Sequence, residues 1–378
     1  MVNSGLDVLL KEHLGRLNNR RIGLVTNPTG VTSSLKPNID ALRDAGVNLV
    51  ALFSPEHGLL GAVADGVQVA SGQDEHTGLP VHSLYGATRK PNAEMLNGID
   101  VLLFDLQDVG VRFYTYTATL GLCLEACAEI KIPLIVLDRP NPINGNWIEG
   151  PIIAKEQQSF VGHGPLPIRF GMTMGELAQF YNSELNTCAE LQIISMQGWE
   201  RRMWFDETEL PWVLSSPNMP HLSTAIVYPG MCLFEGTNLS VGRGTALPFE
   251  TFGAPWIDSY ALADAFNALG IDGAHFRPMA FTPTADKFAD TLCYGVQIHV
   301  TDRNALRPVT MALYLLRTLR AMYPTPFEWI PASFNLLMGD ASVMEKIDRG
   351  EAVSAIVQSW QSELDSFLRV RSNYLMYR

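Results

Sequence analysis

The first 200 residues alternate short aliphatic runs with stretches whose apolar residues recur at helical spacing. The aliphatic runs are residues 21–26, 48–53, 101–104 and 134–137. Nearly continuous runs of this kind are typical of strands buried on both faces of a parallel sheet. Helices are expected at residues 34–45, 117–130 and 173–185, the last beginning with a capping-box pattern, Thr173 followed by Glu176. The alternation predicts a doubly wound α/β sheet.

The pattern changes around residues 215–229, which look like a proline-rich connector. Beyond it come a glycine-rich loop at 235–244, a strand-like run at 294–300, and helices at 309–323 and 352–375. The change predicts two domains, residues 1–224 and a smaller α+β domain over residues 225–378.

Composition narrows the class of protein. The 378 residues are 47% hydrophobic and 17% charged, as in an ordinary globular protein. A net charge of −12 disfavours binding to nucleic acid or to an anionic membrane. The five cysteines form no CxxC pair and the eight histidines no metal-binding motif, so we expect no disulfide framework, metal or cofactor. Oligomeric state leaves no mark on the sequence.

Residues 1–10 lack the basic region and long apolar run of a signal peptide, and no run is long enough to span a membrane. We therefore expect a cytoplasmic protein. A natural chain that begins earlier would read the same way, so export stays open.

Polar clusters follow each of the four predicted strands. They are Thr26–Asn27, residues 54–58, residues 105–108 and residues 138–142. Ligands of open parallel sheets bind outside the carboxyl ends of the strands, so these clusters should face one crevice.

Glu56 and His57 lie in a turn between Pro55 and Gly58. Partial burial there would suit Glu56 to general-acid catalysis, although a solvated turn glutamate would look the same.

The segment 105–116 combines Asp105, Gln107, Asp108, Arg112 and Tyr114, a mixture suited to sugar hydroxyls and ring faces. Alternatively, Asp105 caps the next helix and Arg112 pairs with Asp108.

Two loops could complete the site. Residues 138–151 include Arg139, Asn141 and Trp147, which would stack on a sugar or anchor the loop. In the second domain, residues 234–245 could close over the crevice and supply Glu235, Asn238 and Arg243.

Several of these motifs together resemble the exo-β-N-acetylmuramidase family of the NamZ type. The matching stretches are GLVTNPTG (23–30), SPEHG (54–58), DLQDVGVRFYTY (105–116), DRPNP (138–142), EGP (149–151), RFGMTMGE (169–176), YPG (228–230), FEGTNLSVGRGT (234–245) and PFETFGAPW (248–256). The resemblance covers nearly the whole chain.

The resemblance implies a Rossmann-like catalytic domain, a smaller domain closing the cleft, and release of terminal non-reducing N-acetylmuramic acid from peptidoglycan-derived glycans (MurNAc-GlcNAc). Its catalytic glutamate would be Glu56. Many relatives are exported, whereas a cytoplasmic chain would fit the recycling of internalised wall fragments.

Glycosidases generally need an acid and a second group at the anomeric carbon. With Glu56 as the acid, we favour Glu235 for the second role, with Asp105, Asp108 and the substrate's own acetamido group as alternatives. The lactyl carboxylate of muramic acid suits a guanidinium, and Arg112, Arg139, Arg169 and Arg243 are the candidates. Asn27, His57, Gln107, Asp108, Tyr114, Asn141 and Asn238 are further candidates for contacting the sugar.

Two other functions share this fold. A nucleotide- or cofactor-dependent enzyme would need a glycine fingerprint after the first strand, which the sequence lacks. A non-catalytic sensor of wall fragments would bind the same sugar without cleaving it.

Overall fold

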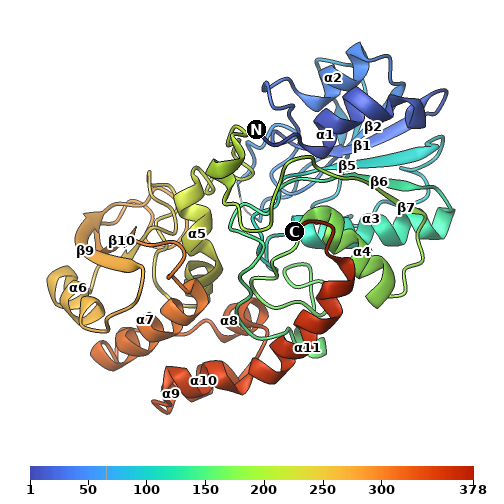
Figure 1. Cartoon of the computed structure of the whole chain (residues 1–378). Helices are drawn as coiled ribbons and strands as arrows, with labels where there is room; N and C mark the ends of the chain where they lie inside the picture. Colours follow the sequence, from blue (N-terminus) through green and yellow to red (C-terminus); the bar gives the residue numbers. More distant parts are fainter. Residues whose placement is uncertain (65) are drawn as a thin grey trace.

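The structure is a computed structural model that describes residues 1–64 and 66–378 (Figure 1). The first part holds a seven-stranded sheet in the order β3-β4-β2-β1-β5-β6-β7. Its strands are β1 (Ile22–Thr26), β2 (Leu49–Ser54), β3 (Gly72–Gln73), β4 (Pro80–Ser83), β5 (Val101–Asp105), β6 (Leu134–Leu137) and β7 (Leu191–Ile194). All neighbouring pairs are parallel except β3 with β4.

Helices cover both faces of this sheet (Figure 1). They are α1 (Gly5–Val8), α2 (Asn38–Asp44), α3 (Tyr116–Ile130) and α4 (Met174–Glu184). Leu6 of α1 and Leu42 of α2 pack in one core with residues of the central strands, while Cys123 of α3 and Leu177 of α4 pack in the core on the other face. The predicted doubly wound α/β sheet is therefore confirmed.

The four aliphatic runs correspond to β1, β2, β5 and β6, and the capping box at Thr173 is present. Helix α2 begins at Asn38, later than expected, because the backbones of Thr32 and Lys36 close a turn just before Pro37. β3, β4 and β7 were not predicted. The two residues of β3 are exposed and most of β7 is half-buried, so neither shows a continuous apolar run.

The second part is smaller and is built on an antiparallel sheet in the order β8-β10-β9. Its elements are α5 (Leu222–Met231), β8 (Thr251–Ala254), α6 (Ser259–Asn267), β9 (Ala274–Phe281), β10 (Cys293–Val300), α7 (Pro308–Met322), α8 (Pro331–Met338), α9 (Ser342–Asp348), α10 (Val353–Ser359) and α11 (Gln361–Arg371). Single 3-10 or π turns occur at Leu9–His13, Leu14–Leu17, Lys155–Gln157, Phe205–Thr208, Cys232–Gly236 (η5) and Ser372–Tyr374. The predicted smaller α+β domain is confirmed.

Two predictions for this part were wrong. Residues 222–229 form most of helix α5 instead of a connector, since the buried helix packs against α7 despite Pro229 inside it. The single helix expected over residues 352–375 is two helices, because Trp360 leaves helical geometry (φ −103°, ψ 2°) and buries its side chain.

The chain returns to the first part at its end. Helix α11 runs back toward α4 (Figure 1), where Phe367 meets Phe180 with ring centroids 5.8 Å apart. The Tyr377 hydroxyl donates to Asp138 at 2.6 Å, and the Arg201 amide donates to the carbonyl of Arg378 at 2.7 Å.

Within the described residues, no helix is both long enough and apolar enough to cross a membrane.

Candidate active site

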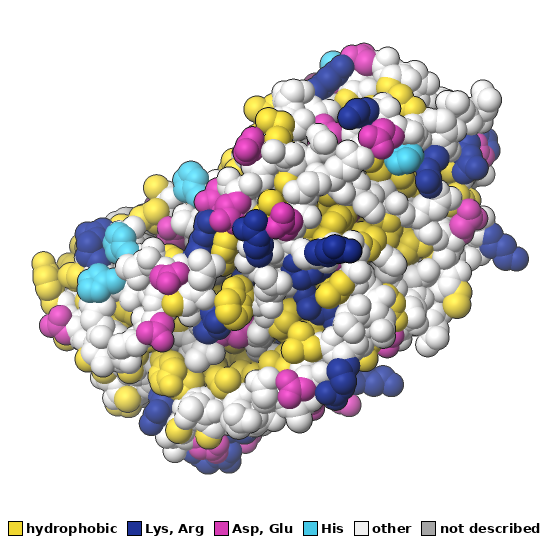
Figure 2. All heavy atoms as spheres, viewed as in Figure 1, with side chains coloured by type: hydrophobic (Ala, Val, Ile, Leu, Met, Phe, Trp, Pro, Cys, Tyr) yellow, Lys and Arg dark blue, Asp and Glu magenta, His cyan; other side chains and the backbone are white. Residues whose placement is uncertain are grey.

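A cavity of about 350 Å³ lies between the two parts of the molecule. The first part contributes residues after β2 and β4, residues 113–115, the turn at 159–161, and residues 216–219. The second part contributes Tyr228, Cys232, Glu235, Arg243, Phe249, Leu336 and Leu337. Figure 2 shows the hollow between the two lobes, with Lys and Arg side chains gathered along it.

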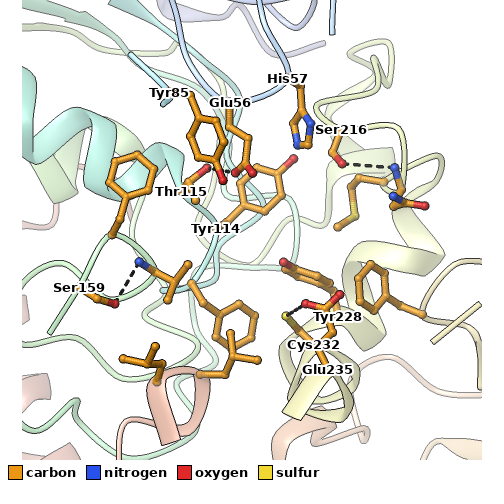
Figure 3. Close-up of a pocket in the computed structure, with 18 of the residues that line it drawn as sticks. Glu56, His57, Tyr85, Tyr114, Thr115, Ser159, Ser216, Tyr228, Cys232 and Glu235 are labelled. Atoms are coloured by element: carbon orange, nitrogen blue, oxygen red, sulfur yellow. Dashed lines mark hydrogen bonds between the residues drawn. The ribbon is translucent and has the colours of Figure 1, made fainter. Parts of the chain in front are cut away.

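Glu56 enters the cavity from the turn that follows β2 (Figure 3). Its half-buried carboxylate accepts a hydrogen bond from the Thr115 hydroxyl at 2.7 Å and one from the Gly66 amide at 3.2 Å. A hydroxyl both donates and accepts, so the Thr115 contact can persist when Glu56 gains or loses a proton.

The backbone of this turn fixes the direction of Glu56. His57 and Gly58 both have positive φ angles, 71° and 78°. Positive φ is costly for residues other than glycine, so His57 needs support. Its buried ring supplies it, because Nδ1 lies 2.9 Å from the carbonyl oxygen of Val63.

Glu235 faces the cavity from η5, across from Glu56 (Figure 3). Arg243 donates to its carboxylate from Nε and Nη2, both at 2.6 Å, and the Cys232 thiol lies 3.6 Å away. Lys287 Nζ donates to the Glu235 carbonyl at 3.0 Å, and burial lowers the pKa of this lysine.

Buried tyrosines line the wall between the two glutamates. The Tyr114 hydroxyl donates to Ser215 Oγ at 2.6 Å, and Tyr114 and Tyr228 meet edge to face. Burial raises the pKa of both phenols well above the ordinary value, which keeps both phenols neutral. The wall therefore offers apolar ring faces and neutral hydroxyls.

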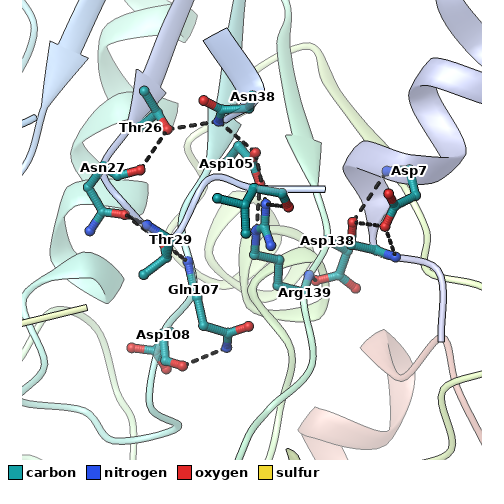
Figure 4. A network of polar contacts seen from close by, with 12 residues as sticks. Asp7, Thr26, Asn27, Thr29, Asn38, Asp105, Gln107, Asp108, Asp138 and Arg139 are labelled. Carbon is teal, nitrogen blue, oxygen red and sulfur yellow. Dashed lines mark hydrogen bonds and ion pairs between the residues drawn. The ribbon is translucent and has the colours of Figure 1, made fainter. Parts of the chain in front are cut away.

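A second polar cluster, at the ends of β1, β5 and β6, lies apart from the cavity (Figure 4). Asp105 is fully buried and binds Arg139 through two contacts, Nε at 2.6 Å and Nη2 at 3.0 Å. Asn38 Nδ2 donates to the same carboxylate at 2.7 Å. The alternative expectation that Asp105 caps a helix is wrong, since its carboxylate is bound to Arg139 and Asn38.

The amide residues of this cluster bind protein groups. Asn27 donates to the Tyr116 hydroxyl at 2.7 Å and accepts from Thr29, and Gln107 donates to the carbonyls of Asp108 and Pro140. These side chains take up most of the crevice at the carboxyl ends of β1 and β5, where nucleotides bind in doubly wound sheets, and leave a pocket of only about 20 Å³ lined by Thr29, Gln107 and Arg139.

Asp108 and Asn141 are also enclosed. Burial raises the pKa of Asp108 to about 7, and one of its oxygens accepts from the Gly110 amide. Asn141 donates to the Met172 carbonyl at 3.0 Å.

Two of the candidate arginines are structural. Arg112 is fully buried and donates to four carbonyl oxygens, those of Pro151, Leu166, Leu337 and Met338, so it does not pair with Asp108. Arg169 is buried and donates to the Ile143 carbonyl. Neither lines the cavity, and Arg139 is held by Asp105.

Two loop residues lie outside the cavity as well. Asn238 exchanges hydrogen bonds with the backbone of Pro326 and Glu328. Trp147 packs against the core with the Arg307 guanidinium 3.6 Å above its ring, so it anchors its loop.

The structure thus brings five of the candidate residues to one cavity, namely Glu56, His57, Tyr114, Glu235 and Arg243. It also adds residues that the sequence analysis missed, among them Tyr85, Arg89, Thr115, Phe160 and Ser216. Tyr85 and Arg89 follow β4, whose short sequence gives no clear strand signal. Ser216 lies in a cluster of Ser, Pro and Asn, which in hindsight marked a loop at the cavity. No described group of three or more His, Cys, Asp or Glu side chains forms a candidate metal site.

Comparisons with known proteins agree over the whole length of the chain. Residues 22–223 match the profile described as "Exo-beta-N-acetylmuramidase NamZ, N-terminal", and residues 226–377 match its C-terminal counterpart. The chain is 48% identical to "Peptidoglycan beta-N-acetylmuramidase NamZ" of Bacillus subtilis (strain 168) over 378 residues, covering 100% of this chain and 91% of the relative.

Two crystal structures of DUF1343 family proteins from Bacteroides fragilis NCTC 9343 share the fold. One has a TM-score of 0.93 at 37% identity, and the other has 0.82 at 31%. Each alignment covers 100% of this chain and 99% of the other.

Proposed function

The chain belongs to the exo-β-N-acetylmuramidase NamZ family, and we propose that the cavity between its two parts carries out that reaction. The protein is a glycoside hydrolase, and its substrate is a peptidoglycan-derived glycan. The bond broken joins a terminal, non-reducing N-acetylmuramic acid to the next sugar. The observation that carries the assignment to this cavity is the pair of carboxylates, Glu56 and Glu235, facing it from the two parts.

Glu56 is the proposed general acid. It protonates the leaving glycosidic oxygen while the anomeric carbon gains positive charge. The Thr115 hydroxyl keeps the carboxyl pointed into the cavity, and the positive-φ turn at His57 limits its movement.

Glu235 is the proposed second group. Its ion pair with Arg243 holds an anionic carboxylate at the cavity wall, where it would stabilise the charge on the anomeric carbon or direct a water to it. Asp105 is a poor candidate because two partners enclose it, and Asp108 lies outside the cavity lining. The substrate's acetamido group remains the other candidate for the second role.

We further propose a boundary at residues 224 and 225, with the second domain closing the cleft. Support comes from the cavity, since Glu235 and Arg243 line it from beyond that boundary. The boundary falls inside helix α5, which would then belong to the joint between the domains.

The test of function compares a chromogenic β-N-acetylmuramide with the matching glucosaminide. Release from the muramide alone, lost in Glu56→Gln, would support both the activity and the acid. If neither glycoside is cleaved while muramic acid still binds, the protein is a sensor and the proposal fails. Proton NMR of the first sugar anomer released then separates inversion from retention.

A further inference from the structure

One cation that lines the cavity, Arg89, pairs with no acidic side chain in the described part of the chain. Arg89 follows β4 and lines the cavity beside Tyr85 and Phe160. Its neighbour Lys90 pairs with two glutamates, and Arg243 pairs with Glu235. For Arg89, no carboxylate of residues 1–64 and 66–378 lies within ion-pairing distance. In a chain of net charge −12, such a guanidinium is a candidate for binding an anionic ligand.

The ring beneath Arg89 is held in place. The Arg89 guanidinium lies 4.6 Å from the Phe160 ring centroid. Phe160 is in a turn closed by two reciprocal backbone hydrogen bonds between Ser159 and Gly162, both at 3.1 Å. A side chain at Gly162 would meet the tip of Ile153 at 2.3 Å, so the turn packs closely against this residue. Stacking orients the guanidinium and leaves its N–H edge available.

A second cavity, of about 600 Å³, adjoins the first at this point. Both are lined by Arg89, Ser159 and Phe160, so the two cavities are neighbours and meet at these residues. The charged side chains that line the second cavity, Arg89 and Lys90, are both basic, and no carboxylate of the described residues lines that cavity.

We propose that Arg89 binds the free carboxylate of the lactyl ether of N-acetylmuramic acid, at the point where the two cavities meet. The inference rests on the proposed function and names its specificity determinant. The lactyl arm is what distinguishes N-acetylmuramic acid from N-acetylglucosamine, and its carboxylate matches the fork of a guanidinium. The other candidate arginines are occupied, three by buried protein groups and Arg243 by Glu235.

The test measures kcat and KM for the para-nitrophenyl β-muramide and for its lactyl amide, which is uncharged. We expect Arg89→Met to raise KM for the acid about tenfold to a hundredfold, the usual worth of a hydrogen bond to a charged group, with kcat within about threefold. KM for the amide should stay within about threefold of the parent value. Arg89→Lys, which keeps the charge but not the fork, should fall between.

Arg349→Met serves as the matched control, because Arg349 is an exposed arginine paired with Glu351 and outside both cavities. It should leave all four constants unchanged. Equal KM increases on acid and amide in Arg89→Met, or no increase on either, would overturn the proposal.

Calorimetry separates this inference from the proposed function, because it needs no hydrolysis. N-acetylmuramic acid should bind the parent protein more tightly than N-acetylglucosamine does, and Arg89→Met should abolish the difference. This result would support Arg89 even if the parent cleaved neither glycoside, the outcome that defeats the proposed function. A preference that survives in Arg89→Met refutes the role of Arg89.

Discussion

Carboxylates follow β2 on one side of β1, and β5 and β6 on its other side, but their surroundings differ. At β5 and β6, Asp105 is enclosed by Arg139 and Asn38, and its oxygens have no room for a ligand. At β2, Glu56 is half-buried and faces a cavity, and Thr115 is its only side-chain partner among the described residues. Polar density at a strand end therefore does not by itself identify a reactive site. A carboxylate at a strand end can act on a ligand only if protein groups do not already occupy its oxygens.

The largest effect we expect comes from Glu56→Gln. Glutamine keeps the shape of the side chain but cannot deliver the proton, so kcat should fall about a thousandfold, within the range for loss of a general acid. The melting temperature should stay close to that of the parent. Steady-state kinetics on the muramide and a thermal melt test both halves of this prediction. A large fall in the melting temperature would show that Glu56, like Asp105, has a structural role.

Asp105→Asn should lower the stability of the fold strongly and the activity only slightly. It leaves Arg139 buried without a counter-charge, which typically costs about 3–5 kcal/mol of unfolding free energy. Urea unfolding gives that loss directly, and kcat per folded molecule should change only a few-fold. Activity that disappears while stability is unchanged would show that Asp105 acts in the reaction.

The pH dependence of the unfolding free energy tests whether Asp108, like Asp105, is a buried structural carboxyl and not a reactive one. Burial raises its pKa to about 7 from the ordinary value of 3.8, so the folded protein holds a proton that the unfolded chain has released. The stability from this group is complete below about pH 4 and is lost as pH rises through about 7. Asp108→Asn should reduce the fall in unfolding free energy between pH 5 and pH 8 by roughly 3 kcal/mol.

Part of the slope should survive in that variant, because burial also raises the pKa of Asp138 to about 7. Asp365→Asn, on an exposed position of α11, is the control and should keep the parent slope. An unchanged slope in Asp108→Asn would contradict the assignment.

The smallest effect should come from Thr115→Val. Valine has nearly the same shape but cannot hydrogen-bond Glu56, so kcat should fall about tenfold, the worth of one hydrogen bond. Thr115→Ser should restore most of the rate. If valine is as active as the parent, Glu56 is positioned by its turn alone.

The sequence allowed the centre of the sheet to be predicted because strands buried on both faces must be continuously apolar, as β1 and β5 are. Edge strands such as β7 are only partly buried and give no such signal. Helix α5 was missed because Pro229 and the prolines before it suggest a loop, and only packing against α7 shows otherwise.

The two carboxylates of the site could be predicted from the sequence, but Arg89 could not. Glu56 and Glu235 lie in motifs whose turns and glycines are visible locally. Arg112, Arg139 and Arg169 looked equally suitable, since a sequence does not reveal whether a guanidinium is surrounded by carbonyls or by solvent. Arg89 was missed for the opposite reason, because only the fold brings Phe160 beneath it.

The return of the chain to the first part constrains how the cleft could open. The second part is attached at α5 and again where α11 and Tyr377 meet the first part, and buried Arg112 adds a third attachment through its hydrogen bonds to the carbonyls of Leu337 and Met338. Three separated attachments leave no single axis about which one part can rotate freely. We therefore expect fluorophores placed on the two lobes to show only a small change in separation on ligand binding.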